Sequence, residues 1–176
     1  MPHDVTRRNL LGFSALTASF LVLGDRLSLS PAEAVELDFT PEILTRDQLK
    51  ILELVAEHLV PGSVDAGIGA YLDAQLRAGE DSLLIGKYVG VDISAQIDFY
   101  KSLASNLQRT LQSDASTPAV VSALWGDALP DWEGPPASYM LFVLRADALD
   151  VTYGTPEGFE ALGIPYMANN MRKQLW

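Results

Sequence analysis

Apolar residues recur at every third or fourth position over most of the chain after residue 45, which is the spacing of one face of an α-helix. The first helix is predicted to begin after Thr45, because Thr45 and Gln48 form a capping box, in which each side chain satisfies a backbone N–H of the first turn. Pro61 and Gly62 are expected to end it. Its apolar face would consist of Leu49, Leu52, Val55, Ala56 and Leu59.

The same spacing continues in later segments, separated by Gly, Pro and Asp residues that favour turns. No sustained alternation of apolar and polar residues, and no Asn-Gly hairpin, indicates a strand. We therefore predict an all-α fold, a small bundle of five or six helices preceded by an N-terminal signal segment. The further helices are expected at residues 64–78, 92–111, 116–125, 137–152 and 155–163.

The first 34 residues have the pattern of an export leader. Arg7 and Arg8, followed by Asn9 and by Leu10 and Leu11, resemble the twin-arginine export signature. As a helix, the apolar residues 10–23 would extend about 21 Å, short of a hydrocarbon core of about 30 Å. A removable leader is therefore favoured over a permanent anchor, and an ordinary secretory leader is the alternative.

The boundary of this leader is predicted from small residues. Ala32 and Ala34 offer an A-x-A cleavage signature, so residues 1–34 are interpreted as the signal peptide and residues 35–176 as a single helical domain. The sequence leaves open whether cleavage after Ala34 takes place. An exported, periplasmic protein follows from this interpretation.

Charge and composition exclude several classes of function. The chain has 12 basic and 23 acidic residues, for a net charge of −11, and it has no Cys. A strongly acidic chain without a basic patch is a poor ligand for nucleic acid. Without Cys there are no disulfides, thiolate metal sites, iron–sulfur clusters or covalently attached haem.

Residues that could perform chemistry are few. His58 lies one position from Glu57 and five from Glu53, but a metal site needs three or four converging ligands. Asp147 and Asp150, with Arg145 nearby, are interpreted as a salt-bridged surface in preference to an acid–base pair. No nucleotide-binding glycine motif or nucleophile elbow is present. We predict no catalytic residue, no metal ligand and no cofactor bound by this chain.

The C-terminal stretch is unusually rich in apolar and aromatic residues. A core position is the favoured interpretation for Phe159 and Leu162. Tyr, Met and Trp side chains on irregular segments are typical of protein–protein contacts. The candidate partner-binding residues are Tyr153, Phe159, Ile164, Pro165, Tyr166, Met167 and Trp176.

Two segments carry a resemblance to a known family. The sequence DALDVTYGTPEGFEALGIPYM at 147–167 resembles the C-terminal signature of the gluconate 2-dehydrogenase subunit 3 family, and LELVAEHLVPG at 52–62 resembles its first helix. The resemblance implies a small, non-catalytic accessory subunit. Its partners would be an FAD-binding large subunit of the glucose–methanol–choline type, in some complexes a cytochrome c subunit, and the twin-arginine translocase. The small subunit would carry the export signal and assist folding of the large one.

Two other hypotheses stay open at this point. One is a stand-alone exported enzyme that uses His58 with Glu53 or Glu57. The other is a small periplasmic module that binds an apolar ligand in an internal pocket. The accessory-subunit hypothesis instead predicts an exposed apolar patch. The sequence does not indicate which sugar or alcohol a complex would oxidise, whether a cytochrome is present, or the stoichiometry.

Overall fold

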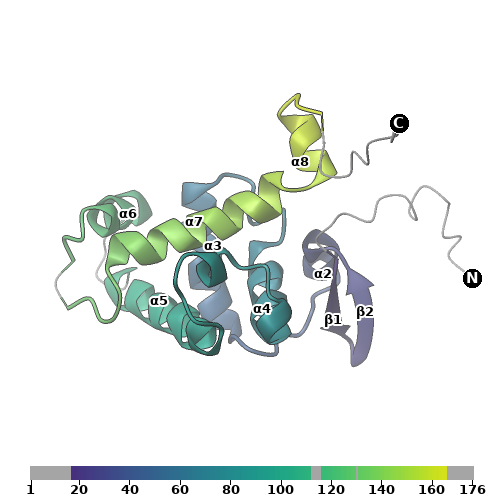
Figure 1. Cartoon of the computed structure of the whole chain (residues 1–176), viewed down its shortest axis with the longest axis horizontal. Coiled ribbons are helices and arrows are strands. Elements are labelled where there is room, and N and C mark those ends of the chain that lie inside the picture. Colours follow the sequence, from purple (N-terminus) through teal and green to yellow (C-terminus); the bar gives the residue numbers. More distant parts are fainter. Residues whose placement is uncertain (1–16, 112–115, 130, 166–176) are drawn as a thin grey trace, which may run out of the picture.

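The computed structural model describes residues 17–111, 116–129 and 131–165. The described chain is mostly helical, with seven α-helices, three short 3₁₀ helices and one two-stranded sheet. Figure 1 shows α3, α4, α5 and α7 packed together, the sheet and α2 at one end, and α8 rising beyond the end of α7. The elements are β1 (Ala18–Val22), β2 (Asp25–Leu29), α2 (Pro31–Glu36), α3 (Arg46–Leu59), α4 (Ile68–Ala78), η1 (Gly79–Asp81), η2 (Ile85–Tyr88), η3 (Ile93–Ala95), α5 (Gln96–Leu111), α6 (Thr117–Trp125), α7 (Ala137–Tyr153) and α8 (Pro156–Ala161).

Helix α3 is the central helix, and the prediction for it is confirmed. Thr45 and Gln48 form both hydrogen bonds of the capping box. Leu49, Leu52, Val55 and Ala56 are buried, and the helix contacts α4, α5, α6 and α7. A capped start and a continuous apolar face are both local properties, which is why the sequence was sufficient to predict this helix.

Helix α4 begins later than predicted. Residues 64–67 form turns, and the helix runs from Ile68 to Ala78. Gly67 has a φ of +83°, a left-handed conformation that glycine adopts without steric cost and that breaks the helical path. Gly79 follows the last residue, as predicted.

The remaining predicted helices are present with small changes at their ends. The helix expected from Asp92 starts as the 3₁₀ turn η3 and continues as α5. Helix α7 buries Leu141, Leu144, Ala148 and Val151, as expected. In the described part of the predicted domain, α3 to α8 correspond to the six expected helices, with α6 and α8 close to their expected ranges.

The all-α prediction does not cover the hairpin of β1 and β2, which lies within the predicted leader. The strands pair antiparallel from Ala18 opposite Leu29 to Val22 opposite Asp25. Leu23 and Gly24 both have positive φ, as a tight hairpin turn requires. Because Leu23 is not a usual residue for that conformation, the turn lacked its normal sequence signature.

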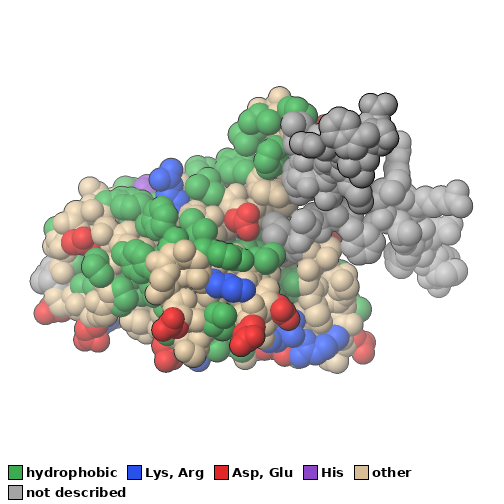
Figure 2. All heavy atoms as spheres, viewed as in Figure 1, with side chains coloured by type: hydrophobic (Ala, Val, Ile, Leu, Met, Phe, Trp, Pro, Cys, Tyr) green, Lys and Arg blue, Asp and Glu red, His purple; other side chains and the backbone are tan. Residues whose placement is uncertain are grey.

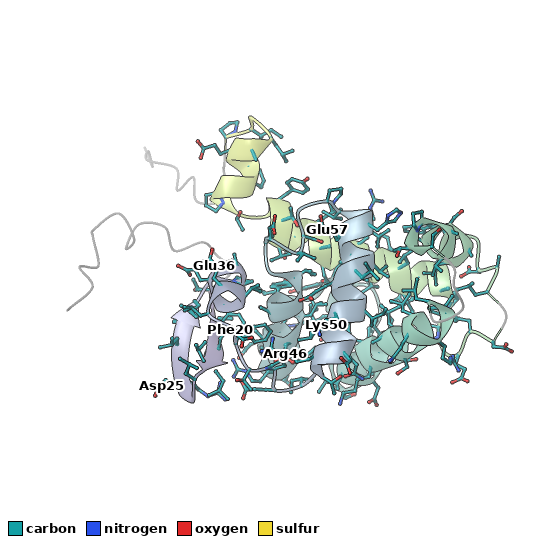
Figure 3. The ribbon with its side chains drawn as sticks, turned by 180° about the vertical axis from the view of Figure 1, so that it is seen from behind. Phe20, Asp25, Glu36, Arg46, Lys50 and Glu57 are labelled. Carbon is teal, nitrogen blue, oxygen red and sulfur yellow. The ribbon has the colours of Figure 1, made fainter. Side chains whose placement is uncertain are left out.

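The hairpin is attached to the body by one face of β1. Phe20 and Val22 are buried, and the Phe20 ring packs edge-on against Phe39 with ring centres 5.8 Å apart. Figure 3 shows Phe20 between the hairpin and the helices, and Asp25 at the outer end of the hairpin. None of the helices in the described ranges combines the length and the apolar character needed to cross a membrane.

Candidate functional site

Helix α7 carries apolar residues on a second side, outside the core. Phe142 and Leu149 are seven residues apart and therefore lie on the same side of the helix. Phe142 is 47 % exposed and Leu149 is 39 % exposed. Large apolar side chains held in water in this way mark a surface that another molecule could cover.

The loop between α4 and α5 extends this surface. Its 3₁₀ turn η2 contacts α7, and the Tyr139 hydroxyl of α7 donates to the Val89 carbonyl at 2.9 Å. Tyr88 is 65 % exposed beside it. Figure 2 shows hydrophobic side chains across the middle of this side of the molecule and on α8, with charged side chains mostly along the lower edge. We call the set the α7 face: Leu83, Tyr88, Val89, Phe142 and Leu149.

A groove of about 500 Å³ lies at the C-terminal end of the α7 face. It runs between the start of η2, the last turns of α7 and the short helix α8. Helix α8 is held close to α7 because Gly158 has no side chain: a Cβ there would lie closer than 3.0 Å to the backbone of Thr152 and Tyr153. The groove is lined by Leu83, Ile85, Ala146, Asp147, Leu149, Asp150, Tyr153, Gly154 and Phe159.

Two carboxylates beside the groove hold its walls in place. Asp147 is only 1 % exposed; it accepts a hydrogen bond from the Ile85 amide at 2.8 Å and another from the Tyr100 hydroxyl. Asp150 accepts from the Tyr71 hydroxyl at 3.1 Å. The interpretation of this pair as a salt-bridged surface is therefore wrong for Asp147, because its partners come from α5 and η2, which sequence spacing does not reveal.

Burial sets the protonation of this cluster. Removal from water raises the pKa of Asp147 from its ordinary 3.8 to about 7, and its two hydrogen bonds oppose part of that rise. Burial, followed by the nearby Asp147, also raises the pKa of the Tyr100 hydroxyl well above its usual value. Both tyrosines, Tyr71 and Tyr100, therefore act as neutral hydrogen-bond donors.

The predicted partner-binding residues divide into three groups. Tyr153 and Phe159 are half-buried and line the groove. Ile164 and Pro165 are exposed after α8. The predictions for Tyr166, Met167 and Trp176 lie outside the described residues.

Leu162 does not complete the core as expected. It is 51 % exposed and follows directly after α8, a helix of only six residues whose main contact is with α7. Leu162 therefore adds to the exposed apolar surface near the groove.

The structure does not bring together the three residues of the enzyme hypothesis, His58, Glu53 and Glu57, as one catalytic group. His58 is exposed, whereas Glu57 accepts hydrogen bonds from the Gly62 and Val64 amides at 2.8 and 3.0 Å, which lower its pKa. Glu53 packs against Gly69 of α4, and burial raises its pKa. Glu57 thus holds the turn between α3 and α4.

Within the described ranges no group of three or more His, Cys, Asp or Glu is placed to hold a metal ion.

Only some of the residues predicted to act in export belong to the part of the chain that the structure describes. Arg7, Arg8, Leu10 and Leu11 lie outside the described residues. Ala32 and Ala34, the predicted cleavage residues, lie inside α2.

Sequence reasoning missed Phe142, Leu149 and the loop residues of the α7 face. A usable signal was present in α7, whose sequence is apolar on more than one side; such a helix is either surrounded by protein or presents one apolar side to another molecule. No helical spacing of apolar residues pointed to the loop residues Leu83, Tyr88 and Val89. They belong to the α7 face because the loop packs on α7, which sequence spacing does not show.

We compared the chain with models of protein families, with curated proteins and with solved structures, and none of the three comparisons gave a match.

Proposed function

We propose that this chain is a non-catalytic small subunit of a periplasmic FAD-dependent sugar or alcohol dehydrogenase. Its partner is a large flavoprotein subunit of the glucose–methanol–choline type, which holds the FAD and performs the oxidation, with or without a cytochrome c subunit. The chain supports folding of the large subunit and binds no cofactor itself. The observation that carries the proposal is the exposed α7 face with the groove beside it.

The physical argument concerns the composition of the α7 face. Tyr and Phe side chains are enriched in the buried centre of protein interfaces, whereas charged residues are depleted there. Tyr88, Phe142 and Leu149 would supply the apolar centre, and the charged residues along its edge would form a polar rim. The groove offers a recess for a protruding side chain of the partner, in the way that interface anchors fill pockets.

Export is the second part of the proposal. Arg7 and Arg8 are read by the twin-arginine translocase, and the folded large subunit is carried across the membrane on this chain. The twin-arginine route transports proteins that are already folded. This chain has no cofactor motif that would require such a route, but the large subunit must fold around its FAD before transport.

Co-expression with the large subunit tests this function. Replacing both Arg7 and Arg8 by Lys should abolish flavoprotein activity in the periplasm while leaving it in the cytoplasm. A matched control is the replacement of Arg145 and Arg109 by Lys, which leaves the leader unchanged. Undiminished periplasmic activity in the Arg7/Arg8 variant would show that the chain is not the carrier.

Binding is tested separately by affinity purification of the tagged chain. The expected result is a stable complex that contains FAD, detected by its absorbance. If the purified chain and the flavoprotein elute separately at micromolar concentration, the subunit assignment fails whichever route is used for export.

A further inference from the structure

The segment that contains the predicted cleavage site is built into the folded body. Phe20, Val22 and Ala34 are at most 5 % exposed and belong to the same core as the central helices. The Leu21 carbonyl accepts a hydrogen bond from the Thr40 amide at 2.7 Å, which pairs β1 with the chain beyond α2. A segment that is cleaved off is not expected to supply buried side chains to the core of the remaining protein.

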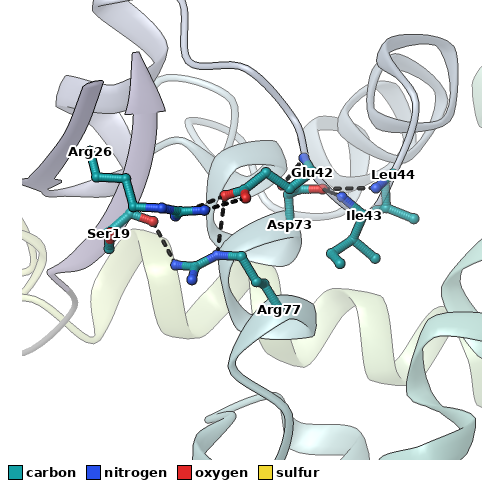
Figure 4. Close-up of polar contacts among 7 residues, drawn as sticks. All are labelled: Ser19, Arg26, Glu42, Ile43, Leu44, Asp73 and Arg77. Carbon is teal, nitrogen blue, oxygen red and sulfur yellow. Dashed lines mark hydrogen bonds and ion pairs between the residues drawn. The ribbon is translucent and has the colours of Figure 1, made fainter. Parts of the chain in front are cut away.

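Charged groups fasten the hairpin to α4 and to the loop before α3, as Figure 4 shows. Arg26 of β2 forms an ion pair with Glu42 at 2.5 Å, and Arg77 of α4 contacts the same carboxylate at 3.3 Å. Arg77 also donates to the Ser19 carbonyl of β1 at 2.6 Å. Glu42 is in turn held by Asp73, which accepts a hydrogen bond from its amide at 2.8 Å.

The bond after Ala34 is protected by local structure. Ser30 and Glu33 form a capping box at the start of α2. The Ala34 amide donates to the Ser30 carbonyl, and the Ala34 carbonyl accepts from Phe39, each at 3.0 Å. A protease binds its substrate as an extended, accessible strand, so cleavage here requires α2 to unfold first.

Gly67 shows how closely α2 is fitted. A Cβ at this position would lie closer than 3.0 Å to the backbone of Pro31 and Ala32. The N-terminal end of α4 therefore has room for the backbone of α2 only because residue 67 is glycine.

We propose that residues 18–36 are a permanent part of the folded protein and that the peptide bond after Ala34 stays intact once the chain has folded. Any processing of the leader then takes place on the N-terminal side of the hairpin. The proposal rests on the packing of residues 18–77. It restricts any removable export leader to the residues before the hairpin, but its tests do not require that export takes place.

Hydrogen exchange of the full chain, followed by mass spectrometry, tests the docking directly. Peptides from residues 18–36 should exchange about 100-fold or more slowly than an unstructured chain, as expected for packed elements. Exchange of these peptides at the unstructured rate would overturn the proposal. The intact mass of the folded protein gives a second readout, and a folded species that begins at Val35 would overturn it equally.

A matched pair of glycine variants isolates the contact with α2. Gly67→Ala and Gly79→Ala both place Ala at a positive φ at an end of α4, but only Gly67→Ala also collides with Pro31, since a Cβ at Gly79 meets nothing within 4 Å. Exchange in residues 18–36 should rise at least about tenfold in Gly67→Ala and stay unchanged in Gly79→Ala. Equal exchange of this segment in the two variants would count against the docking.

If Gly67→Ala does not fold, Arg77→Gln provides the same readout, because it removes the ion pair with Glu42 and weakens the bond to Ser19. Undiminished export in the Arg7/Arg8 variant would overturn the proposed function and leave these exchange rates unaffected. The two proposals can therefore fail independently.

Discussion

At the scale of single residues, Asp73 shows how one buried carboxylate orders a loop. Its two oxygens accept hydrogen bonds from the amides of Glu42, Ile43 and Leu44 at 2.8 to 2.9 Å. Asp73 itself is only 3 % exposed. A loop amide that loses its acceptor in such a place is left without water as a substitute, which is costly.

Asp73→Ala should therefore lower the free energy of unfolding by about 2–4 kcal/mol, since three amides lose a charged acceptor. Urea denaturation monitored by circular dichroism measures the loss. Asp65→Ala is the control, because Asp65 is exposed and its removal should change stability by less than about 0.5 kcal/mol. Equal effects of the two substitutions would contradict the role given to Asp73.

Burial of Asp147 should make the free energy of unfolding depend on pH. Its pKa is raised to about 7 in the folded protein by burial, above its ordinary 3.8 in the unfolded chain. Between these values the folded state holds a proton that the unfolded state has lost, so the contribution of Asp147 to stability is complete below about pH 4 and is lost as the pH rises to about 7. The slope is at most about 1.4 kcal/mol per pH unit.

Asp147→Asn removes this titration while keeping a side chain of the same shape. The free energy of unfolding should consequently fall less between about pH 4.5 and about pH 7.5 in the variant than in the parent chain. Denaturant titrations at both pH values give the difference. Parallel pH profiles for the two proteins would mean that Asp147 is ionised in the folded state throughout.

At the scale of elements, α7 serves two surfaces at once. One side supplies buried residues to the core, including Leu144 and Val151, and the other presents Phe142 and Leu149 to solvent. A helix with apolar residues on both its buried and its exposed side has little amphipathic pattern. The sequence therefore does not show which of the two apolar sides is exposed.

Phe142→Asp and Leu149→Asp should each weaken binding of the flavoprotein about 10- to 100-fold, as expected for residues at the centre of an interface. Stability should fall by no more than about 1–2 kcal/mol, because each side chain is only about half buried. Leu54→Asp on α3 is the matched control: Leu54 is as exposed as Phe142, at 47 % each. Affinity measured by surface plasmon resonance should be unchanged in that control.

An affinity that falls equally in all three variants would assign the effect to charge rather than to the α7 face. Unchanged affinity in both α7 variants would place the interface elsewhere on the protein.

At the scale of the whole molecule, the excess of acidic residues matters most. The net charge of −11 places the folded chain under self-repulsion. Two of the four ion pairs found in the described ranges, Arg46 with Asp38 and Arg109 with Glu133, have largely exposed partners, and exposed pairs contribute little to stability.

Sodium chloride should therefore raise the melting temperature, because screening of the general repulsion outweighs the weakening of a few exposed pairs. The Debye length falls from about 30 Å at 0.01 M salt to about 10 Å at 0.1 M, so most of the rise should occur in that range. Differential scanning calorimetry at fixed pH measures it. A melting temperature that falls with added salt would show that the ion pairs dominate.

The sequence by itself determined most of the helices, since a capped start, an apolar stripe and a terminating Gly or Pro are all local. Thr45 and Gln48 illustrate this for α3, as Gly79 does for the end of α4. Only the tertiary structure decided the use of Asp147, the exposure of Phe142 and the docking of the hairpin through Phe20. Each of those depends on neighbours far along the chain, and a residue's burial and hydrogen-bond partners are fixed by such neighbours rather than by sequence spacing.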